Sequence, residues 1–204
     1  MSSSSGPRPS EPSMRRLVNF YDPSINGRDA RGRTLSEILE WSDEKLERQH
    51  DYIQTVFPLP EESVFSFEAP VIDEETMLIF ARSPGLQRNL LRALKRMLAF
   101  YGFDAQDRGP GLRLTIAPRA DCERGFAHWV RRMDHNHLRI TRIIRCLRVL
   151  GLGGAAKDFF DALIAVCQSR GAVGSTSIAF WTRAVEDPLC RAPDGTEVDW
   201  LERY

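Results

Sequence analysis

The stretch "HNHLRITRIIRCLRVLGL", residues 135–152, has the most regular pattern in this chain of 204 residues. Its apolar side chains recur at steps of three and four, which is the spacing of one face of an α-helix. They are Ile140, Ile143, Ile144, Leu147 and Leu150. Arginines at steps of three, from Arg139 to Arg148, follow the other half of the helix. The pattern predicts an amphipathic core helix whose basic face is solvated.

The same periodicity extends on both sides of this stretch. Ser83 followed by Pro84 indicates a helix start, because proline suits the first helical position. The apolar stripe that follows consists of Leu86, Leu90, Leu94, Met97 and Tyr101. Only residues 112–118, "LRLTIAP", show a weak strand pattern. We therefore predict an all-α fold, a single compact multi-helix domain.

Two N-cap residues organise the region before Pro58. Thr34 is placed to cap a short helix in "TLSEILEW", and Ser42 to cap the next. Along this second helix the spaced positions are Leu46, His50, Ile53 and Phe57. The spacing predicts one helix that ends before Pro58, with His50 inside its apolar stripe.

The N-terminal region differs in composition from the rest. Residues 1–16 are rich in Ser, Pro and Gly, which predicts a disordered tail. Residues 17–33 contain Asp-Pro and Asn-Gly turns, so the domain of residues 17–204 is expected to begin with a loop-rich entry. A secretory signal and an apolar run of membrane-spanning length are both missing. The prediction is a soluble intracellular protein.

The net charge is zero but unevenly distributed. Residues 1–75 carry −7, residues 76–160 carry +10, and residues 161–204 carry −3. The simplest interpretation is charge complementarity between the N-terminal half and the middle, and an anion-binding face is the alternative. Nucleic-acid binding is disfavoured, because the whole chain is neutral and its arginines lack interleaved aromatic residues.

Motifs for metal or cofactor binding are absent from the sequence. His135 and His137 lie two residues apart, so on a helix they point in different directions. No paired-cysteine or His-Glu-x-x-His spacing occurs, and "GLGG" lacks the context of a nucleotide-binding loop. We expect neither a metal nor a cofactor.

One set of polar residues could form a site. Asn136, Arg139 and Arg142 form a line on one helix, and His50 and Gln54 form another on a second helix. If the two helices pack together, a polar pocket with a fixed cation could hold a carboxylate. The structural alternative makes Asn136 an N-cap, His50 a hydrogen-bonded core histidine, and the arginines partners of the acidic N-terminal half.

Three blocks in order carry a family resemblance. They are "ILEWSDEKLERQHDYIQTVFPLPEESVF", "LLRALKRMLAFYGFDAQDRG" and "HNHLRITRIIRCLRVLGL", and "FW..AV" at residues 180–185 adds to them. Together they resemble the conserved N-terminal domain of the opioid growth factor receptor family. The resemblance spans roughly Phe20 to Val185. Thr55 and His137 depart from it, where the family often has Trp and Asn or Tyr, respectively.

This resemblance implies a function that composition does not reveal. Vertebrate members of the family bind the pentapeptide Met-enkephalin, restrain cell proliferation, and associate with membranes and the nucleus. It therefore implies signalling receptor activity and peptide binding. The implied location is the cytoplasm or nucleus, with peripheral membrane association.

Three functional hypotheses follow. In the first, a short peptide or small organic acid binds with its carboxylate on Arg139 or Arg142, and the apolar contacts come from Tyr52, Phe57 and Phe100. In the second, an enzyme or accessory protein acts on a small molecule, with His50 as general acid/base beside Gln54 and Asn136. The third is an interaction scaffold without a pocket.

Overall fold

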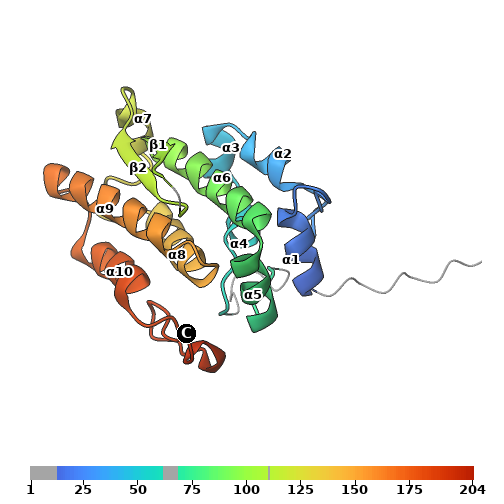
Figure 1. The fold of residues 1–204 in the computed structure, drawn as a ribbon. Coiled ribbons are helices and arrows are strands. Elements are labelled where there is room, and N and C mark those ends of the chain that lie inside the picture. Colours follow the sequence, from blue (N-terminus) through green and yellow to red (C-terminus); the bar gives the residue numbers. More distant parts are fainter. Residues whose placement is uncertain (1–12, 62–68, 110) are drawn as a thin grey trace, which may run out of the picture.

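The computed structural model describes residues 13–61, 69–109 and 111–204, and it is mostly helical (Figure 1). The helices are α1 Ser13–Tyr21, α2 Leu35–Leu39, α3 Asp43–Arg48, α4 Tyr52–Val56, α5 Glu74–Arg82, α6 Pro84–Phe100, α7 Cys122–Phe126, α8 His135–Val149, α9 Gly153–Arg170 and α10 Ser175–Glu186. A 3-10 turn at Asp199–Leu201 follows. Two strands, β1 Phe103–Asp107 and β2 Leu114–Pro118, pair between α6 and α7.

Helix α8, the opening stretch of the sequence, lies at the centre of the fold. It packs against α9 and α10, which also contact each other (Figure 1). Ile140, Ile143, Ile144 and Leu147 are completely buried. The stripe on α6 is buried as well, and Ser83 caps that helix with Pro84 in its first turn. The predicted core helices are therefore confirmed.

The prediction of a solvated basic face on α8 is wrong. Arg139 and Arg145 are only 5% and 1% exposed, and Arg142 and Arg148 are partly buried. Arg139 and Arg142 bind backbone carbonyls of the N-terminal half, and Arg145 pairs with Glu61. Buried guanidinium groups require such partners. Of these contacts, the pair of Arg145 and Glu61 is the one that joins opposite charges, as expected from the charge distribution.

The prediction of a purely all-α fold is also wrong in one place. Strands β1 and β2 form an antiparallel hairpin, with Phe103 opposite Pro118 and Asp107 opposite Leu114. The hairpin packs against α6 and α9. Asp158 of α9 accepts a hydrogen bond from the backbone N–H of Leu114, which joins the hairpin to the helices. The weak strand pattern at residues 112–118 contains β2, so only β1 was not predicted.

The region before Pro58 confirms the predicted caps but not the predicted single helix. Thr34 forms a reciprocal capping box with Glu37, and Ser42 accepts from the N–H of Lys45. The predicted helix is split into α3 and α4, because Gln49 adopts an extended conformation with ψ 130°. His50 lies in this break and is exposed, so its predicted place in the buried stripe is wrong.

The described structure begins inside the predicted tail. Of the predicted tail, residues 1–12 lie outside the described residues, and residues 13–16 already belong to α1. The entry therefore begins with a helix and becomes a loop only after Tyr21. Leu17, Phe20 and Tyr21 are buried. The backbone carbonyl of Tyr21 accepts a 2.8 Å hydrogen bond from Asn89, which fixes α1 to α6.

Candidate functional site

A cavity of about 500 Å³ lies beside α4, α8 and α10 and the segment after α10. It is lined by His50, Ile53, Gln54, Leu59, Glu61, His135, Leu138, Arg139, Thr141, Arg142, Arg145, Phe180, Ala192, Pro193 and Asp194. Four of the five predicted site residues are in this lining, and Asn136 is not. The structure therefore brings the two predicted polar lines together, although His50 is not helical.

Arg139 is fixed by the N-terminal half of the chain. Its guanidinium donates to the backbone carbonyls of three residues near the end of α3, namely Leu46, Glu47 and Gln49. The last carbonyls of a helix have no partner within it, so Arg139 satisfies groups that would otherwise be unpaired. It also lies over the ring of Tyr52, 5.6 Å from the centroid. Arg139 thus supports the cavity wall, with few donors left for a ligand.

The contact between Arg139 and His50 determines where the imidazole carries its proton. Nη2 of Arg139 lies 3.1 Å from Nδ1 of His50. Because a guanidinium can only donate, Nδ1 must accept, and neutral His50 then carries its proton on Nε2. Although His50 is exposed as a whole residue, partial desolvation of its ring, followed by the charges of Arg139 and His135, lowers its pKa from 6.5. His50 is therefore an N–H donor at neutral pH.

Arg142 is the cation most open to a ligand. One of its Nη1 donors reaches the carbonyl oxygen of Phe57 at 3.0 Å, its only hydrogen bond to the described residues. Burial lowers the pKa of this guanidinium, which nevertheless stays protonated. A guanidinium has five N–H donors. Several of them therefore remain for an anion that enters the cavity.

Arg145 and Glu61 form a buried ion pair that the sequence reasoning missed. Nη2 of Arg145 lies 2.6 Å from Oε1 of Glu61, and their side chains are 1% and 12% exposed. Nη1 of Arg145 is buried without a hydrogen-bond partner among the described residues. The arginine series at steps of three pointed to Arg145, but nothing in the sequence distinguished Glu61 from its neighbours.

Gln54 places an unpaired acceptor at the same cavity. Its Oε1 is buried and accepts no hydrogen bond from the parts of the chain that the structure describes. An unpaired buried carbonyl is unfavourable, because it loses its hydrogen bonds to water without replacement. Such a group is a recognised sign of a missing partner.

Asn136 does not line the cavity, but it contacts Arg139, which does. It is completely buried, donates to Oε2 of Glu47 at 3.0 Å, and accepts from Arg139 at 3.2 Å. The N-cap of α8 is Asp134, so the structural alternative that made Asn136 an N-cap is wrong. Asn136 positions Arg139, which in turn contacts His50.

The apolar wall differs from the one predicted. Tyr52, Phe57 and Phe100 are at most 1% exposed and belong to the core, so they do not line the cavity. The apolar lining instead includes Ile53, Leu59, Leu138 and Phe180. Leu138 is 68% exposed and forms the most open part of this apolar wall.

The histidines are held by other interactions. His135 contacts Glu47 and Asp134, and His137 binds the carbonyl of Trp129 and the hydroxyl of Ser177. Within residues 13–61, 69–109 and 111–204, no group of three His, Cys, Asp or Glu side chains could hold a metal ion.

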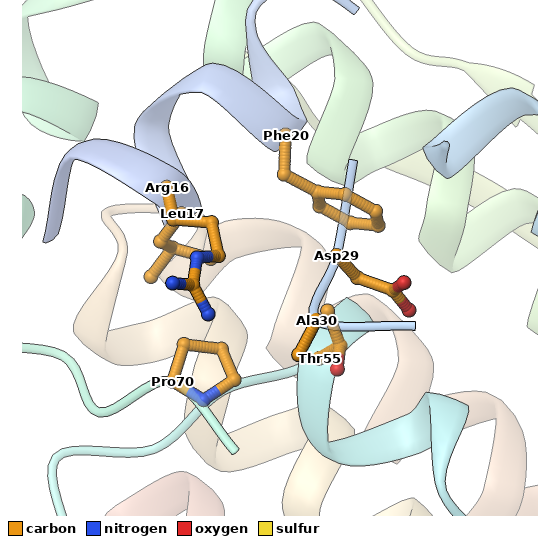
Figure 2. Close-up of a pocket in the computed structure, with 7 residues that line it drawn as sticks. All are labelled: Arg16, Leu17, Phe20, Asp29, Ala30, Thr55 and Pro70. Carbon is orange, nitrogen blue, oxygen red and sulfur yellow. The ribbon is translucent and has the colours of Figure 1, made fainter. Parts of the chain in front are cut away.

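A second cavity, of about 30 Å³, lies under α1. Figure 2 shows its lining, with Arg16, Leu17 and Phe20 on one side and Asp29, Ala30, Thr55 and Pro70 on the other. The carboxylate of Asp29 already binds Arg33 at 2.7 Å. This space fits about one water molecule, so the larger cavity is the candidate site.

Comparisons with known proteins identify relatives of this chain. A rat protein named opioid growth factor receptor is 38% identical over 124 residues, which are 59% of this chain and 20% of the rat protein. The human protein of that name is 38% identical, over 18% of its length. Opioid growth factor receptor-like protein 1 of Xenopus tropicalis is 33% identical over 123 residues, 23% of its length.

The match covers only a part of these relatives. The chain spans about a fifth of their length. No solved structure matches it. No helix in the described parts is long and apolar enough to cross a membrane. The family model of the opioid growth factor receptor conserved region matches residues 11–191, and the chain therefore belongs to this family.

Proposed function

We propose that this domain is a receptor-type binding module for a short peptide or a small organic acid. The observation that carries the proposal is the position of Arg142, which lines a partly apolar cavity and makes one hydrogen bond to the described residues. A volume of about 500 Å³ is within the range of small-ligand sites. The Nε2–H of His50 supplies a further donor.

The relatives support a peptide as the ligand class. Their name describes receptors for an opioid growth factor. The residues around the cavity lie in the region that matches the family, except Ala192, Pro193 and Asp194, which follow it. Signalling receptor activity, a location in the cytoplasm or nucleus and peripheral membrane association are part of the same proposal. Ligand recognition by the cavity is the step that can be tested on this chain alone.

Binding explains the site better than the enzymatic alternative. A general base needs a free lone pair, and His50 would have to offer it at Nε2, since Nδ1 accepts from Arg139. The same contact places the proton on Nε2. His50 is thus arranged to donate a hydrogen bond. We therefore favour recognition of a ligand over proton abstraction from a substrate by His50.

Calorimetry with Met-enkephalin and with small N-acyl amino acids tests the proposal. We expect at least one of these probes to bind the wild type, and Arg142→Gln to weaken that binding at least tenfold, because a charged hydrogen bond is lost. The exposed Arg88 of α6 provides the control, and Arg88→Gln should leave affinity unchanged. Absence of binding to any probe, or equal binding by both variants, would contradict the proposal.

A further inference from the structure

The unpaired groups of the large cavity define its ligand more narrowly. This inference rests on the proposed binding function. Nη1 of Arg145 is a buried donor without a partner, and Oε1 of Gln54 is a buried acceptor without one, within the described parts of the chain. Both residues line the same cavity, and so do Arg142 and several apolar side chains. A matching ligand therefore needs both an anionic acceptor and an N–H donor.

The charge of the lining limits the charge of the ligand. Three arginines face the cavity, and the two carboxylates of Glu61 and Asp194 offset two of them. Without the histidines, one positive charge remains. A ligand with a single negative charge balances it, whereas a doubly charged phosphate leaves one charge unpaired in a partly buried site. A free amino acid, neutral overall, leaves the positive charge of the site unbalanced.

The donor that Gln54 requires can be an ordinary amide. Rotation about the last side-chain bond of Gln54 is soft, because torsions of this kind are broad. Its Oε1 can thus turn toward a ligand without a change in the backbone. A peptide N–H lies close to the carboxylate at the C-terminus of any peptide, and the same holds in an N-acyl amino acid. Both required groups therefore occur together in this class of molecule.

We propose that the cavity binds the C-terminal end of a peptide, or an N-acyl amino acid, with an apolar last side chain. The carboxylate lies on Arg142, with Arg145 as the second cation. The amide N–H donates to Oε1 of Gln54. The last side chain packs against Leu138 and Phe180, which form an apolar part of the lining. The exposure of Leu138, 68%, decreases when this side chain is in place.

Calorimetry on the full chain with four probes tests each chemical group of this ligand in turn. N-acetyl-phenylalanine has the carboxylate, the amide N–H and the ring. Its C-terminal amide lacks the charge, 3-phenylpropionate lacks the N–H, and phenyl phosphate carries a different anion. We expect N-acetyl-phenylalanine to bind most tightly, with a loss of about tenfold or more for the C-terminal amide. Phenyl phosphate should bind more weakly as well.

The variant that tests Gln54 is Gln54→Leu, which keeps a similar size and removes the acceptor. It should weaken N-acetyl-phenylalanine about fivefold to tenfold, the effect of one hydrogen bond. Its affinity for 3-phenylpropionate should not decrease, since that probe has no N–H. Gln106→Leu, on the exposed side of β1, is the matched control and should change neither affinity. The urea midpoint of each variant shows whether it is folded.

The outcomes distinguish this inference from the proposed function. Equal weakening of both probes by Gln54→Leu, or tightest binding of phenyl phosphate, would overturn the inference and leave the binding function in place. Binding of Met-enkephalin without binding of N-acetyl-phenylalanine would also overturn the inference and leave the binding function in place. If neither the peptide nor any small probe binds, the proposed function itself fails.

Discussion

Arg139 and His50 share a hydrogen bond of 3.1 Å, although 89 residues separate them. The same guanidinium binds the carbonyl of Gln49 at 2.8 Å, next to His50 in the chain. Arg139 therefore fixes both the backbone and the ring at the break between α3 and α4. One buried cation on the central helix holds the wall of the candidate site.

The first prediction concerns the stability that Arg139 contributes. Arg139→Ala should lower the free energy of unfolding by about 3 kcal/mol, because several buried carbonyls lose a charged donor. Arg139→Lys should recover only part of this loss, since an ammonium group cannot reproduce the planar fork of a guanidinium. Urea unfolding followed by circular dichroism measures both variants.

Arg88→Ala is the control for Arg139, because Arg88 is exposed on α6. Its effect should stay within about 0.5 kcal/mol. An Arg139→Ala protein as stable as this control would show that the carbonyls find other partners. The structural role of Arg139 would then be wrong.

The second prediction concerns the pH dependence caused by His50. The folded protein lowers the pKa of His50 below 6.5, chiefly through burial and then through Arg139 and His135. The unfolded chain therefore binds a proton more readily. The contribution of His50 to stability is complete above pH 6.5 and is lost as the pH falls through the folded pKa.

Two measurements check the His50 prediction. NMR titration of the ring should give a pKa below 6.5, and urea unfolding should show that wild type loses more stability than His50→Gln between pH 7.5 and pH 5. A measured pKa at or above 6.5 would mean that Arg139 and His135 do not act on His50 as described. Equal losses in the two proteins would lead to the same conclusion.

The core was predictable because the helical spacing of apolar residues indicates which side chains are buried. Ile140, Ile143 and Ile144 are fully buried, as their spacing indicates. The break at Gln49 was not predictable in this way. It is stabilised by Arg139, a residue 90 positions away, and no local pattern contains that contact. Of the hairpin, the weak pattern at residues 112–118 indicated β2, and β1 was not predicted.

For the candidate site as well, spacing within one helix predicted part of the arrangement, and contacts between distant segments determine the rest. Spacing placed Arg139 and Arg142 on one side of α8, and the structure brings them to one cavity with His50 and Gln54. Spacing could not show that Arg139 binds several backbone carbonyls while Arg142 makes a single hydrogen bond to the described residues. This difference depends on which segments of the N-terminal half lie opposite each residue.

The third prediction concerns Asp158, which joins the hairpin to α9. Burial alone would raise the pKa of this carboxyl, but the hydrogen bonds from Arg113 and Leu114 and the charges of Arg113 and Arg108 lower it. Its contribution to stability is present above about pH 4 and is lost as the pH falls through the lowered value. Asp158→Asn should cost about 1–2 kcal/mol at pH 7.

The control for Asp158 lies three residues further along the same helix. Asp161 is exposed and pairs with Lys157, so Asp161→Asn should cost less than about 0.5 kcal/mol. Thermal unfolding at pH 7 and pH 3 compares both variants with wild type. The deficit of Asp158→Asn should shrink at pH 3, and a deficit of the same size at both pH values would contradict the assigned role of its charge.

The last prediction concerns the buried pair of Arg145 and Glu61. Glu61→Leu should lower the free energy of unfolding by about 3 kcal/mol, because the charge of Arg145 stays buried without its partner. Replacing both residues, with Arg145→Met added, removes that unpaired charge. The double variant should therefore be more stable than Glu61→Leu alone and lie within about 1 kcal/mol of wild type.

A double-mutant cycle, measured by urea unfolding, decides whether this coupling exists. A coupling energy of about 2 kcal/mol or more agrees with the pair distance of 2.6 Å and the 1% exposure of Arg145. Additive effects would show that the two side chains act independently. Because both residues line the cavity, additive effects would also mean that Glu61 does not offset the charge of Arg145 there. The expected preference for a singly charged ligand would then weaken.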